Sequence, residues 1–403
     1  MSRFKEYVVG HRMASLRTLS FRIIIPNSDA FDSVGVTQRD NSAFTRSIRY
    51  LWAILKSIED RCHMRQALKL RVHLSAQPSH SVRSFRGDPL DFVNDRNLTT
   101  TPEDLTPLPW IDGFSVIGTS RGIHSAALTR LASRFQDLTY FKVHLEEKST
   151  QVRSDMAREI SNLFLPRLSE LVVNFGNNLL PLKSSLSSDA FSVALHGLFQ
   201  SPNLLKVSLG DVRITPELFW PRLEEFGGRQ NPVWPYLQSM TVMISSEWPD
   251  GTSLHIHEHL IGEFESARLD MSRVNPLFMA AARAAQYMPK LLKMTLRVEA
   301  HKDMDCPLCE MAFAAQGYCS EEDIKGYHAA LRLDGFIFLD SRNLVLRPYQ
   351  LDLSKPRVSV VMPSKCTIDS RLAQVWKISK GEDVDYNVCS GFVRDDDDDE
   401  DND

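Results

Sequence analysis

One spacing of apolar residues recurs along this chain. Residues 201–212 read SPNLLKVSLGDV and residues 288–299 read MPKLLKMTLRVE, so an apolar side chain stands at positions i, i+3 and i+5 of each stretch. The alternation of apolar and polar residues at the end of this spacing is the period of a β-strand with one buried face. Six clear copies begin at Leu16, Leu138, Leu168, Leu204, Leu237 and Leu291. A seventh, less regular copy lies in QALKLRVHL.

The residues around the copies predict the elements that flank each strand. Apolar residues at helical spacing fill FTRSIRYLWAILKSIEDRC, HSAALTRLASRF, SSDAFSVALHGLFQ and NPLFMAAARAAQYM. Asn275 and Pro276 are expected to cap and open the last of these helices. Proline stops a helix and favours a turn, and it stands two residues before the first leucine at Pro166, Pro202, Pro235 and Pro289. Each unit is therefore predicted to be a helix, a turn and a strand.

The units follow one another closely enough to predict a stacked repeat. Successive first leucines from Leu138 to Leu291 are 30, 36, 33 and 54 residues apart. Stacked strand–helix units share a core that one unit cannot form alone, and such units are typical of leucine-rich repeats. The predicted fold class is α/β: one irregular leucine-rich-repeat-like solenoid from about residue 11 to 390, with parallel strands on one face and helices on the other. The alternative is an ordinary α/β domain whose strands happen to look alike.

The predicted solenoid has a defined core and an irregular repeat. Regular leucine-rich repeats carry Asn or Cys shortly after the strand, whereas this chain has Glu146, Gly176 and Val212 there. We therefore expect irregular curvature. The side chains expected in the core are Leu168, Val173, Leu204, Leu209, Leu237, Leu291 and Leu296.

The rest of the chain divides by composition. Residues 1–74 are expected to hold N-terminal helix–strand units, and residues 75–122, rich in Pro, Ser, Asp and Thr, a long loop insertion. Residues 123–364 are expected to hold degenerate repeat units with a second insertion at 245–272. Residues 365–394 are expected to form a C-terminal cap, with a short helix in RLAQVWKI. Residues 395–403, DDDDDEDND, are an acidic tail that is predicted to be disordered.

The net charge differs between the tail and the body. The chain carries 47 basic and 51 acidic residues, and without the eight acids of the tail the remaining 43 leave a body of net charge +4. Such a body does not favour nucleic acid as a partner. The first residues lack the apolar core of a secretory signal, and no apolar run approaches the roughly 20 residues of a membrane span. Because six cysteines are too few for a disulfide scaffold, we expect a cytoplasmic or nuclear protein with no membrane partner.

One stretch of the chain offers ligand types that suit zinc. HKDMDCPLCEMAFAAQGYC contains His301, Cys306, Cys309 and Cys319, but only one pair of these is closely spaced. The alternative is a loop insertion whose thiols bind no metal. We expect no zinc.

A second stretch, HIHEH, would place three histidines on one side of a strand, a geometry that could bind a metal. The alternative is a polar loop that happens to be rich in histidine, at His255, His257 and His259. The sequence contains no Gly-rich phosphate loop, nucleophile elbow or HExxH motif. We therefore expect no cofactor and no enzymatic activity.

A protein-binding surface is the remaining candidate. Residues between the buried strand positions point to the other face, which is concave in a solenoid. Their mixture of cations, hydroxyls and apolar groups suits a protein partner better than a phosphate backbone. The alternative is that these are ordinary solvated strand residues with no binding role. Loop aromatics, with Trp110 and Trp248 as candidates, would add affinity. The expected partner-binding residues are Arg22, Lys142, His144, Asn174, Ser208, Thr241, Met243, Thr295 and Arg297, with Ser20 and Val172 beside them.

Three parts of the sequence resemble a known family. SLRTLSFRIIIP with FTRSIRYLWAIL, then NPLFMAAARAAQYMPKLLKMTLR, then LRPYQLDLSKPRVSVV with RLAQVWK are similar to segments of the F-box and leucine-rich-repeat-like proteins of filamentous ascomycete fungi. The last of these is similar to their C-terminal end, often described as a domain of unknown function. The resemblance implies a non-enzymatic protein–protein recognition module, similar to the substrate-binding part of an F-box ubiquitin-ligase receptor.

The F-box itself is not seen in this sequence, which opens with MSRFKEYVVG where that module is expected to have ended. A Skp1-type adaptor is therefore an expected partner only if an F-box lies outside this chain. The alternative is an interaction scaffold or decoy with no ubiquitin-ligase connection.

Overall fold

The structure is a computed structural model of the chain, and it describes the greater part of the predicted strands and helices. The described residues are 15–26, 33–61, 69–78, 90–92, 105–117, 122–145, 150–176, 189–221, 234–258, 266–298, 309–316, 318, 355–363 and 366–391.

The chain divides into two compact units. Unit 1 comprises Met1–Leu182 and Ala190–Gly210, and unit 2 comprises Lys183–Asp189 and Asp211–Asp403. Both units are α/β, and most of their strand pairs are parallel.

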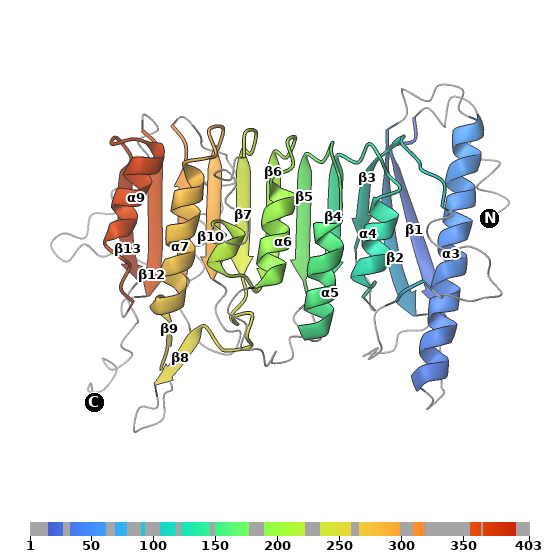
Figure 1. The fold of residues 1–403 in the computed structure, drawn as a ribbon, viewed down its shortest axis with the longest axis horizontal. Helices are drawn as coiled ribbons and strands as arrows, with labels where there is room; N and C mark the ends of the chain where they lie inside the picture. The colour runs from blue at the N-terminus through green and yellow to red at the C-terminus, as the bar shows by residue number, and fades with distance from the viewer. Residues whose placement is uncertain are drawn as a thin grey trace, which may run out of the picture. The chain divides into compact units, whose positions relative to one another are not determined.

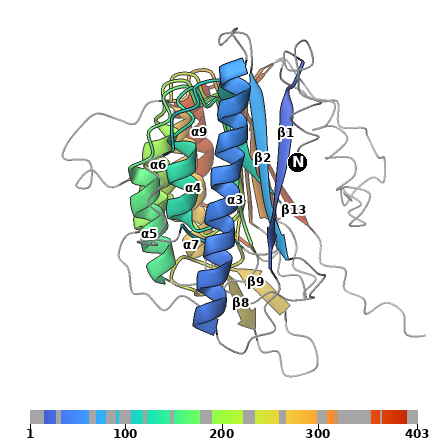
Figure 2. The ribbon, with the colours of Figure 1, turned by 90° about the vertical axis from the view of Figure 1, so that its right-hand side faces the viewer.

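Unit 1 is a parallel sheet whose strand order follows the chain order, β1 to β6. Helices lie along one face of these strands (Figures 1 and 2). Most strand connections contain a helix, which is the kind of crossover that parallel pairing needs. In chain order the described elements are β1 (Thr18–Ile25), α3 (Ser33–Arg61), β2 (Leu70–Pro78), β3 (Ile111–Val116), α4 (Ser125–Ala132), β4 (Tyr140–Leu145), α5 (Thr150–Ser161), β5 (Glu170–Phe175), α6 (Ala190–Phe199) and β6 (Lys206–Val212).

The side chains that face the helices form the core, as the spacing predicts. Strands β4 and β5 alternate strictly between half-buried and buried positions. The seven predicted core residues are all confirmed as buried, with at most 4% of the side chain exposed: Leu168, Val173, Leu204, Leu209, Leu237, Leu291 and Leu296.

A hydrogen-bonded turn precedes several of the strands. In each turn the amide of the first leucine donates to the carbonyl three residues earlier, over 3.1–3.2 Å. Proline is favoured at the second position of such a turn, because its fixed φ suits the bend. The bond is present at Leu138, Leu168, Leu204 and Leu291, and the last three of these turns contain the predicted proline.

Side-chain hydroxyls link neighbouring strands of unit 1 at the start of each strand. The hydroxyl of Ser169 donates to the carbonyl of Thr139 over 2.9 Å, and the hydroxyl of Thr139 donates to the carbonyl of Asp112 over 3.0 Å. The backbone amides of Ser169 and Glu170 also donate to the Thr139 carbonyl, each over 2.9 Å. These bonds connect β3, β4 and β5 where the strands begin. The Asn or Cys of a regular leucine-rich repeat instead stands shortly after the strand.

The range 75–122 contains a central strand of unit 1, where the sequence predicts a long loop. Strand β2 continues to Pro78, and β3 lies between β2 and β4. The register shifts between Leu70 and Arg71, and this irregularity leaves Asp112 without a partner in β2. Gly113 and Ser115 are buried although they face away from the helices. The skipped Asp112 puts the buried Ile111 and Phe114 three residues apart, so only Phe114 and Val116 keep the alternation by which a strand is recognised. The parts of this range at 79–89, 93–104 and 118–121 lie outside the described residues.

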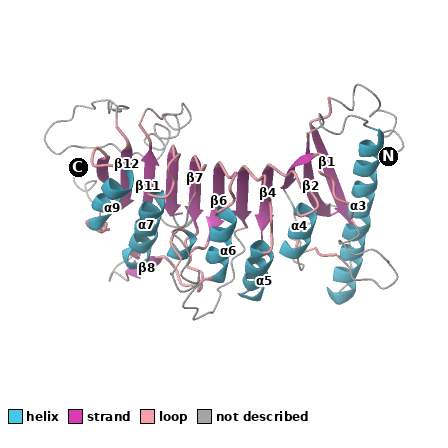
Figure 3. Ribbon diagram, turned by 45° about the horizontal axis from the view of Figure 1, so that its top comes forward, coloured by secondary structure: helices cyan, strands magenta, loops and turns pink. Residues whose placement is uncertain are grey.

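Unit 2 contains a sheet in the order β7-β10-β11-β12-β13 and a separate pair, β8-β9, within the region predicted as an insertion. Helices α7 and α9 lie on one face of the larger group of strands (Figures 1 and 3). The described elements are η2 (Pro216–Leu218), β7 (Ser239–Ile244), β8 (His255–Glu258), β9 (Ser266–Leu269), α7 (Met271–Ala285), β10 (Lys293–Val298), β11 (Cys309–Ala314), β12 (Arg357–Pro363), α9 (Arg371–Lys380) and β13 (Asp385–Gly391).

Strand β11 corrects the prediction that all strands are parallel. It pairs antiparallel with β10 on one side and with β12 on the other. Only residues 299–308 connect β10 to β11, and a parallel pair needs a crossover of about a dozen residues or more. The short connection therefore reverses the chain direction.

The helix predicted in RLAQVWKI is confirmed as α9, and the strand β13 follows it at the edge of the sheet. The indole of Trp376 stacks on the ring of Phe313 in β11 with 5.1 Å between ring centroids. The hydroxyl of Ser379 donates to the carbonyl of Ala282 in α7 over 2.7 Å. Asn275 does not cap α7, which begins five residues earlier after Asp270. Its side chain instead accepts the amide of residue 369 over 3.1 Å and so holds the segment before α9.

Candidate functional site: the open sheet faces

In each unit the described helices lie on one face of the sheet and leave the other face, here called the open face, without a helix (Figures 2 and 3). All the predicted partner-binding residues lie at strand positions that alternate with the buried ones, and each is half-buried or exposed. The open face of unit 1 carries Ser20, Arg22, Lys142, His144, Val172, Asn174 and Ser208, and the open face of unit 2 carries Thr241, Met243, Thr295 and Arg297.

The strand register of unit 1 arranges the open-face residues in rows across the sheet. Side chains in register on neighbouring strands lie next to each other, since strands are spaced about 4.8 Å apart. One row is Ser20, His73, Ser115, Lys142, Val172 and Ser208. The next row is Thr18, Arg71, Gly113, Tyr140, Glu170 and Lys206.

Arg71 reaches over a glycine to stack on an aromatic ring. Its guanidinium carbon lies 4.9 Å from the ring centroid of Tyr140, two strands away. Gly113 stands between them, and a Cβ there would lie 2.6 Å from Cγ of Arg71. The missing side chain therefore leaves the space that the arginine occupies, and the cation–π contact fixes the position of the guanidinium.

His73 and Ser115 form a hydrogen bond in the adjoining row, between Nδ1 of the ring and the hydroxyl. Ser115 is fully buried beneath this contact. Burial, and then the charges of Arg71 and Lys142, lower the pKa of His73. The histidine is therefore neutral at pH 7, and two cations lie close enough to influence it.

Tyr140 lies between a cation and an anion. Burial, and then the charge of Glu170, raise the pKa of its phenol, while the charge of Arg71 opposes the rise. Glu170 is in register with Lys206 of β6 on its other side. Opposite charges therefore lie side by side at the β5–β6 end, whereas the cations Arg71 and Lys142 at the β2–β4 end form no ion pair with a described carboxylate.

The sequence prediction did not name Arg71, His73, Ser115 and Tyr140, and the reason differs from one strand to the next. Arg71 and His73 belong to the blurred copy QALKLRVHL, whose alternation does predict that they face away from Leu70 and Val72. Ser115 belongs to a stretch predicted as a loop, although it stands between the alternating apolar residues Phe114 and Val116. Tyr140 directly precedes the buried Phe141, and extending the β4 pattern by one residue would have found it.

The open face of unit 2 carries a different set of groups. Thr241 is in register with Thr295, and Met243 is in register with Arg297. Arg297 is in turn in register with Glu310 of β11. Burial raises the pKa of Glu310, and the charges of Arg297 and Lys293 oppose that rise.

The two loop tryptophans have different environments. Trp110 is 6% exposed, so it belongs to the core of unit 1 and the prediction that it is a loop anchor is wrong. Trp248 is half-buried, and the guanidinium carbon of Arg273 lies 5.5 Å from its ring centroid. Arg273 also forms a 3.5 Å ion pair with Asp250. Trp248 therefore lies partly covered by a side chain of its own unit.

The predicted metal-binding stretches are only partly described. Cys309 is buried in β11, and burial, with smaller contributions from Cys366 and Glu310, raises its pKa to about 12. His301, Cys306 and Cys319 lie outside the described residues. The HIHEH stretch forms strand β8, but the side chains of His255 and His257 are not described, and His259 lies outside. Within the described part of the chain, no three His, Cys, Asp or Glu residues are placed to hold a metal.

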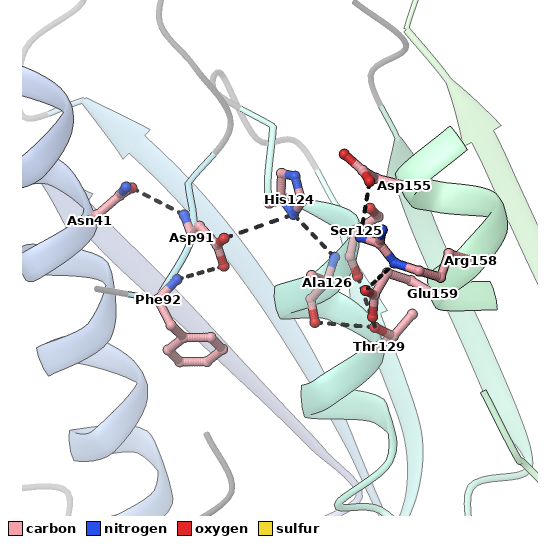
Figure 4. Close-up of polar contacts among 10 residues, drawn as sticks. All are labelled: Asn41, Asp91, Phe92, His124, Ser125, Ala126, Thr129, Asp155, Arg158 and Glu159. Carbon is pink, nitrogen blue, oxygen red and sulfur yellow. Dashed lines mark hydrogen bonds and ion pairs between the residues drawn. The ribbon is translucent and has the colours of Figure 1, made fainter. Parts of the chain in front are cut away.

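A separate polar group lies on the helix side of unit 1 (Figure 4). Nδ1 of His124 accepts the amide of Ala126 over 3.2 Å and lies 3.9 Å from a carboxylate oxygen of Asp91. The amide of Asp91 donates to the side chain of Asn41 in α3 over 3.0 Å. The buried hydroxyl of Ser125 has no hydrogen-bond partner in the described structure. Because Nδ1 of His124 caps α4, the contacts among Asn41, Asp91 and His124 connect α3 to the start of α4. Asp91, His124 and Ser125 therefore do not form a nucleophilic triad.

Comparison with known proteins gives no match to a protein-family model, to a curated protein or to a solved structure. In the described chain, no helix has both the length and the apolar character needed to cross a membrane.

Proposed function

We propose that the chain is a non-enzymatic protein–protein recognition module that binds its partner on the open sheet faces. The observation that carries this proposal is the arrangement of unit 1 in register rows. Polar and charged side chains adjoin one another across its strands, and no described helix covers them. Such a surface offers a partner many neighbouring contacts, with Arg and Tyr among them, which are enriched at protein interfaces.

We also propose that both units are stretches of an irregular leucine-rich-repeat-like solenoid. The turn that recurs before the strands supports it. So do the hydroxyl links between Asp112, Thr139 and Ser169, which join neighbouring strands in the same way. Stacked units of this kind present one extended strand face. The open faces would then correspond to the concave surface of such repeats.

The resemblance to F-box proteins supports a role as the substrate-binding part of a ubiquitin-ligase receptor in the cytoplasm or nucleus. In that role a Skp1-type adaptor would bind an F-box outside this chain. The alternative is a scaffold or decoy that holds the same partner without delivering it to a ligase. In-frame genomic sequence upstream that encodes a helical segment opening with Leu-Pro would favour the receptor, and its absence would favour the scaffold.

The test is a quantitative pull-down from the native host with three forms of the chain. The face variant carries Lys142→Glu, Asn174→Arg and Thr295→Arg, which are substitutions on the open faces that avoid the core. The control variant carries equal charge changes at exposed positions of the helix side: Arg130→Glu, Ser154→Arg and Gln286→Arg.

We expect the wild-type chain and the control variant to retain the same partners, and the face variant to lose them while keeping its circular dichroism spectrum. Equal recovery by all three folded forms would show that the open faces are not the binding surface.

A further inference from the structure

We propose that the open face of unit 1 binds an acidic peptide segment of the protein partner, and that Arg71 and Lys142 are the cations that hold its carboxylates. This inference rests on the proposed function, because it names the partner chemistry for one of the open faces. It goes beyond the partner-binding residues expected from the sequence, since Arg71 is not among them.

Arg71 is held in place before any ligand arrives. The ring of Tyr140 supports its guanidinium at 4.9 Å, and the absent side chain of Gly113 leaves room for its stem. A guanidinium offers a planar fork of donors that fits a carboxylate. Because the side chain is already ordered, an incoming carboxylate loses less free energy to immobilising it.

The charges of Arg71 and Lys142 are not neutralised within the described structure. No ion pair joins either side chain to a carboxylate among the described residues. Both charges act on His73, which is two residues from Arg71 on β2 and lies in the same row as Lys142, with Ser115 and Ser20 as its neighbours on the adjoining strands. The acidic member of the register rows, Glu170, lies beside Lys206.

The distance between the two cations indicates an extended chain as the ligand. Arg71 is on β2 and Lys142 is on β4, one row further along, so their backbones are roughly 12 Å apart given the usual strand spacing and rise. Acids that are three or four residues apart in an extended peptide span about the same distance. A nucleic-acid backbone would need a longer series of cations than this face provides.

The test is fluorescence anisotropy with a labelled peptide of alternating Asp and Glu. A peptide of alternating Asn and Gln has nearly the same shape without charge and serves as the matched ligand. The chains compared are the full-length wild type, Arg71→Gln, Lys142→Gln and the control Arg130→Gln, which removes an exposed cation from α4 on the helix side. Circular dichroism establishes that each is folded.

We expect the wild type to bind the acidic peptide, to ignore the amide peptide, and to lose affinity as salt is added. Arg71→Gln and Lys142→Gln should each weaken binding by about tenfold, which is the loss expected for a charge-assisted hydrogen bond. Arg130→Gln should bind like the wild type, because an exposed cation away from the face adds little.

Two results would overturn the inference. One is that neither the full chain nor a variant ending at Arg394 prefers the acidic peptide to the amide peptide. The other is that Arg130→Gln weakens binding as much as the two face variants. Neither result bears on the pull-down, which would still report whether the open faces bind a partner of other chemistry.

Discussion

At the scale of single residues, the open face of unit 1 depends on a position that has no side chain. Gly113 is buried beneath Arg71, and a Cβ at this position would lie 2.6 Å from Cγ and 3.2 Å from Cδ of that arginine. Contacts at 2.6 Å cannot be accommodated unless the arginine moves. The contact between Arg71 and Tyr140 therefore requires glycine, and so does the anchoring of the proposed carboxylate-binding cation.

Replacing Gly113 with alanine should lower the free energy of unfolding by about 1–3 kcal/mol, which is the usual cost of overpacking. The matched control is Gly197→Ala in α6, where a Cβ has no neighbour within 4 Å. That control should stabilise the chain by about 0.5–1 kcal/mol, because alanine favours a helix over glycine. Urea denaturation measures both, and equal stabilities for Gly113→Ala and the wild type would contradict the tight packing.

At the scale of elements, the docking of α9 onto α7 and β11 includes a half-buried cation, Lys380. Nζ of Lys380 donates to the carbonyl of Met288 over 2.8 Å and lies 5.5 Å from the ring centroid of Phe313. Burial lowers the pKa of this amine to about 8, from 10.5 in the unfolded chain. The carbonyl and the ring attract the charged form, so they offset part of the cost of burying it.

This pKa predicts how the docking of α9 depends on pH. Between pH 8 and 10.5 the unfolded chain holds more protons than the folded chain, so stability contributed by Lys380 rises with pH across this window. Lys380→Met has no such group. We expect the wild type to gain stability relative to Lys380→Met as pH rises, by less than the about 3 kcal/mol that the full shift would carry.

Urea denaturation of both chains at several pH values, with a probe in unit 2, measures this difference. Lys380→Arg is the control that keeps the charge throughout and should show no gain over the window. A difference between wild type and Lys380→Met that stays constant from pH 8 to 10.5 would contradict the docked position of the amine.

At the scale of the whole chain, the acidic tail determines the sign of the net charge. The full chain has a formal net charge of −4, and the chain without residues 395–403 has a net charge of +4. Long-range electrostatics depend on this sum at low ionic strength and are screened at high ionic strength. The tail should therefore affect the binding of charged ligands whether or not it touches them.

A variant ending at Arg394 should bind the acidic peptide about fivefold more tightly than the full chain at low salt. The difference should disappear near 1 M salt, where the Debye length is about 3 Å. A tail of the same length made of Asn and Gln is the control, and it should behave like the deletion. Affinities that are equal at low salt would show that the tail has no electrostatic effect on this face.

The sequence by itself determined the local features of this protein. Alternation at Leu168, Leu171 and Val173 predicts which side of β5 is buried, because side chains of a strand alternate whatever the strand packs against. The same reasoning placed Lys142 and Asn174 on the opposite side. The helical spacing of RLAQVWKI predicted α9, whose periodicity also arises within a few residues.

Only the tertiary structure decided the features that depend on residues far apart in the chain. Strand β3 escaped prediction because its pairing with β2 skips Asp112, which puts Ile111 and Phe114 three residues apart and confines the apolar alternation of this short strand to Phe114 and Val116. The antiparallel direction of β11 depends on how a short connection returns to the sheet. Arg71 and Tyr140 meet only because three strands pair in one register, and register is a relation between segments that no single segment's sequence contains.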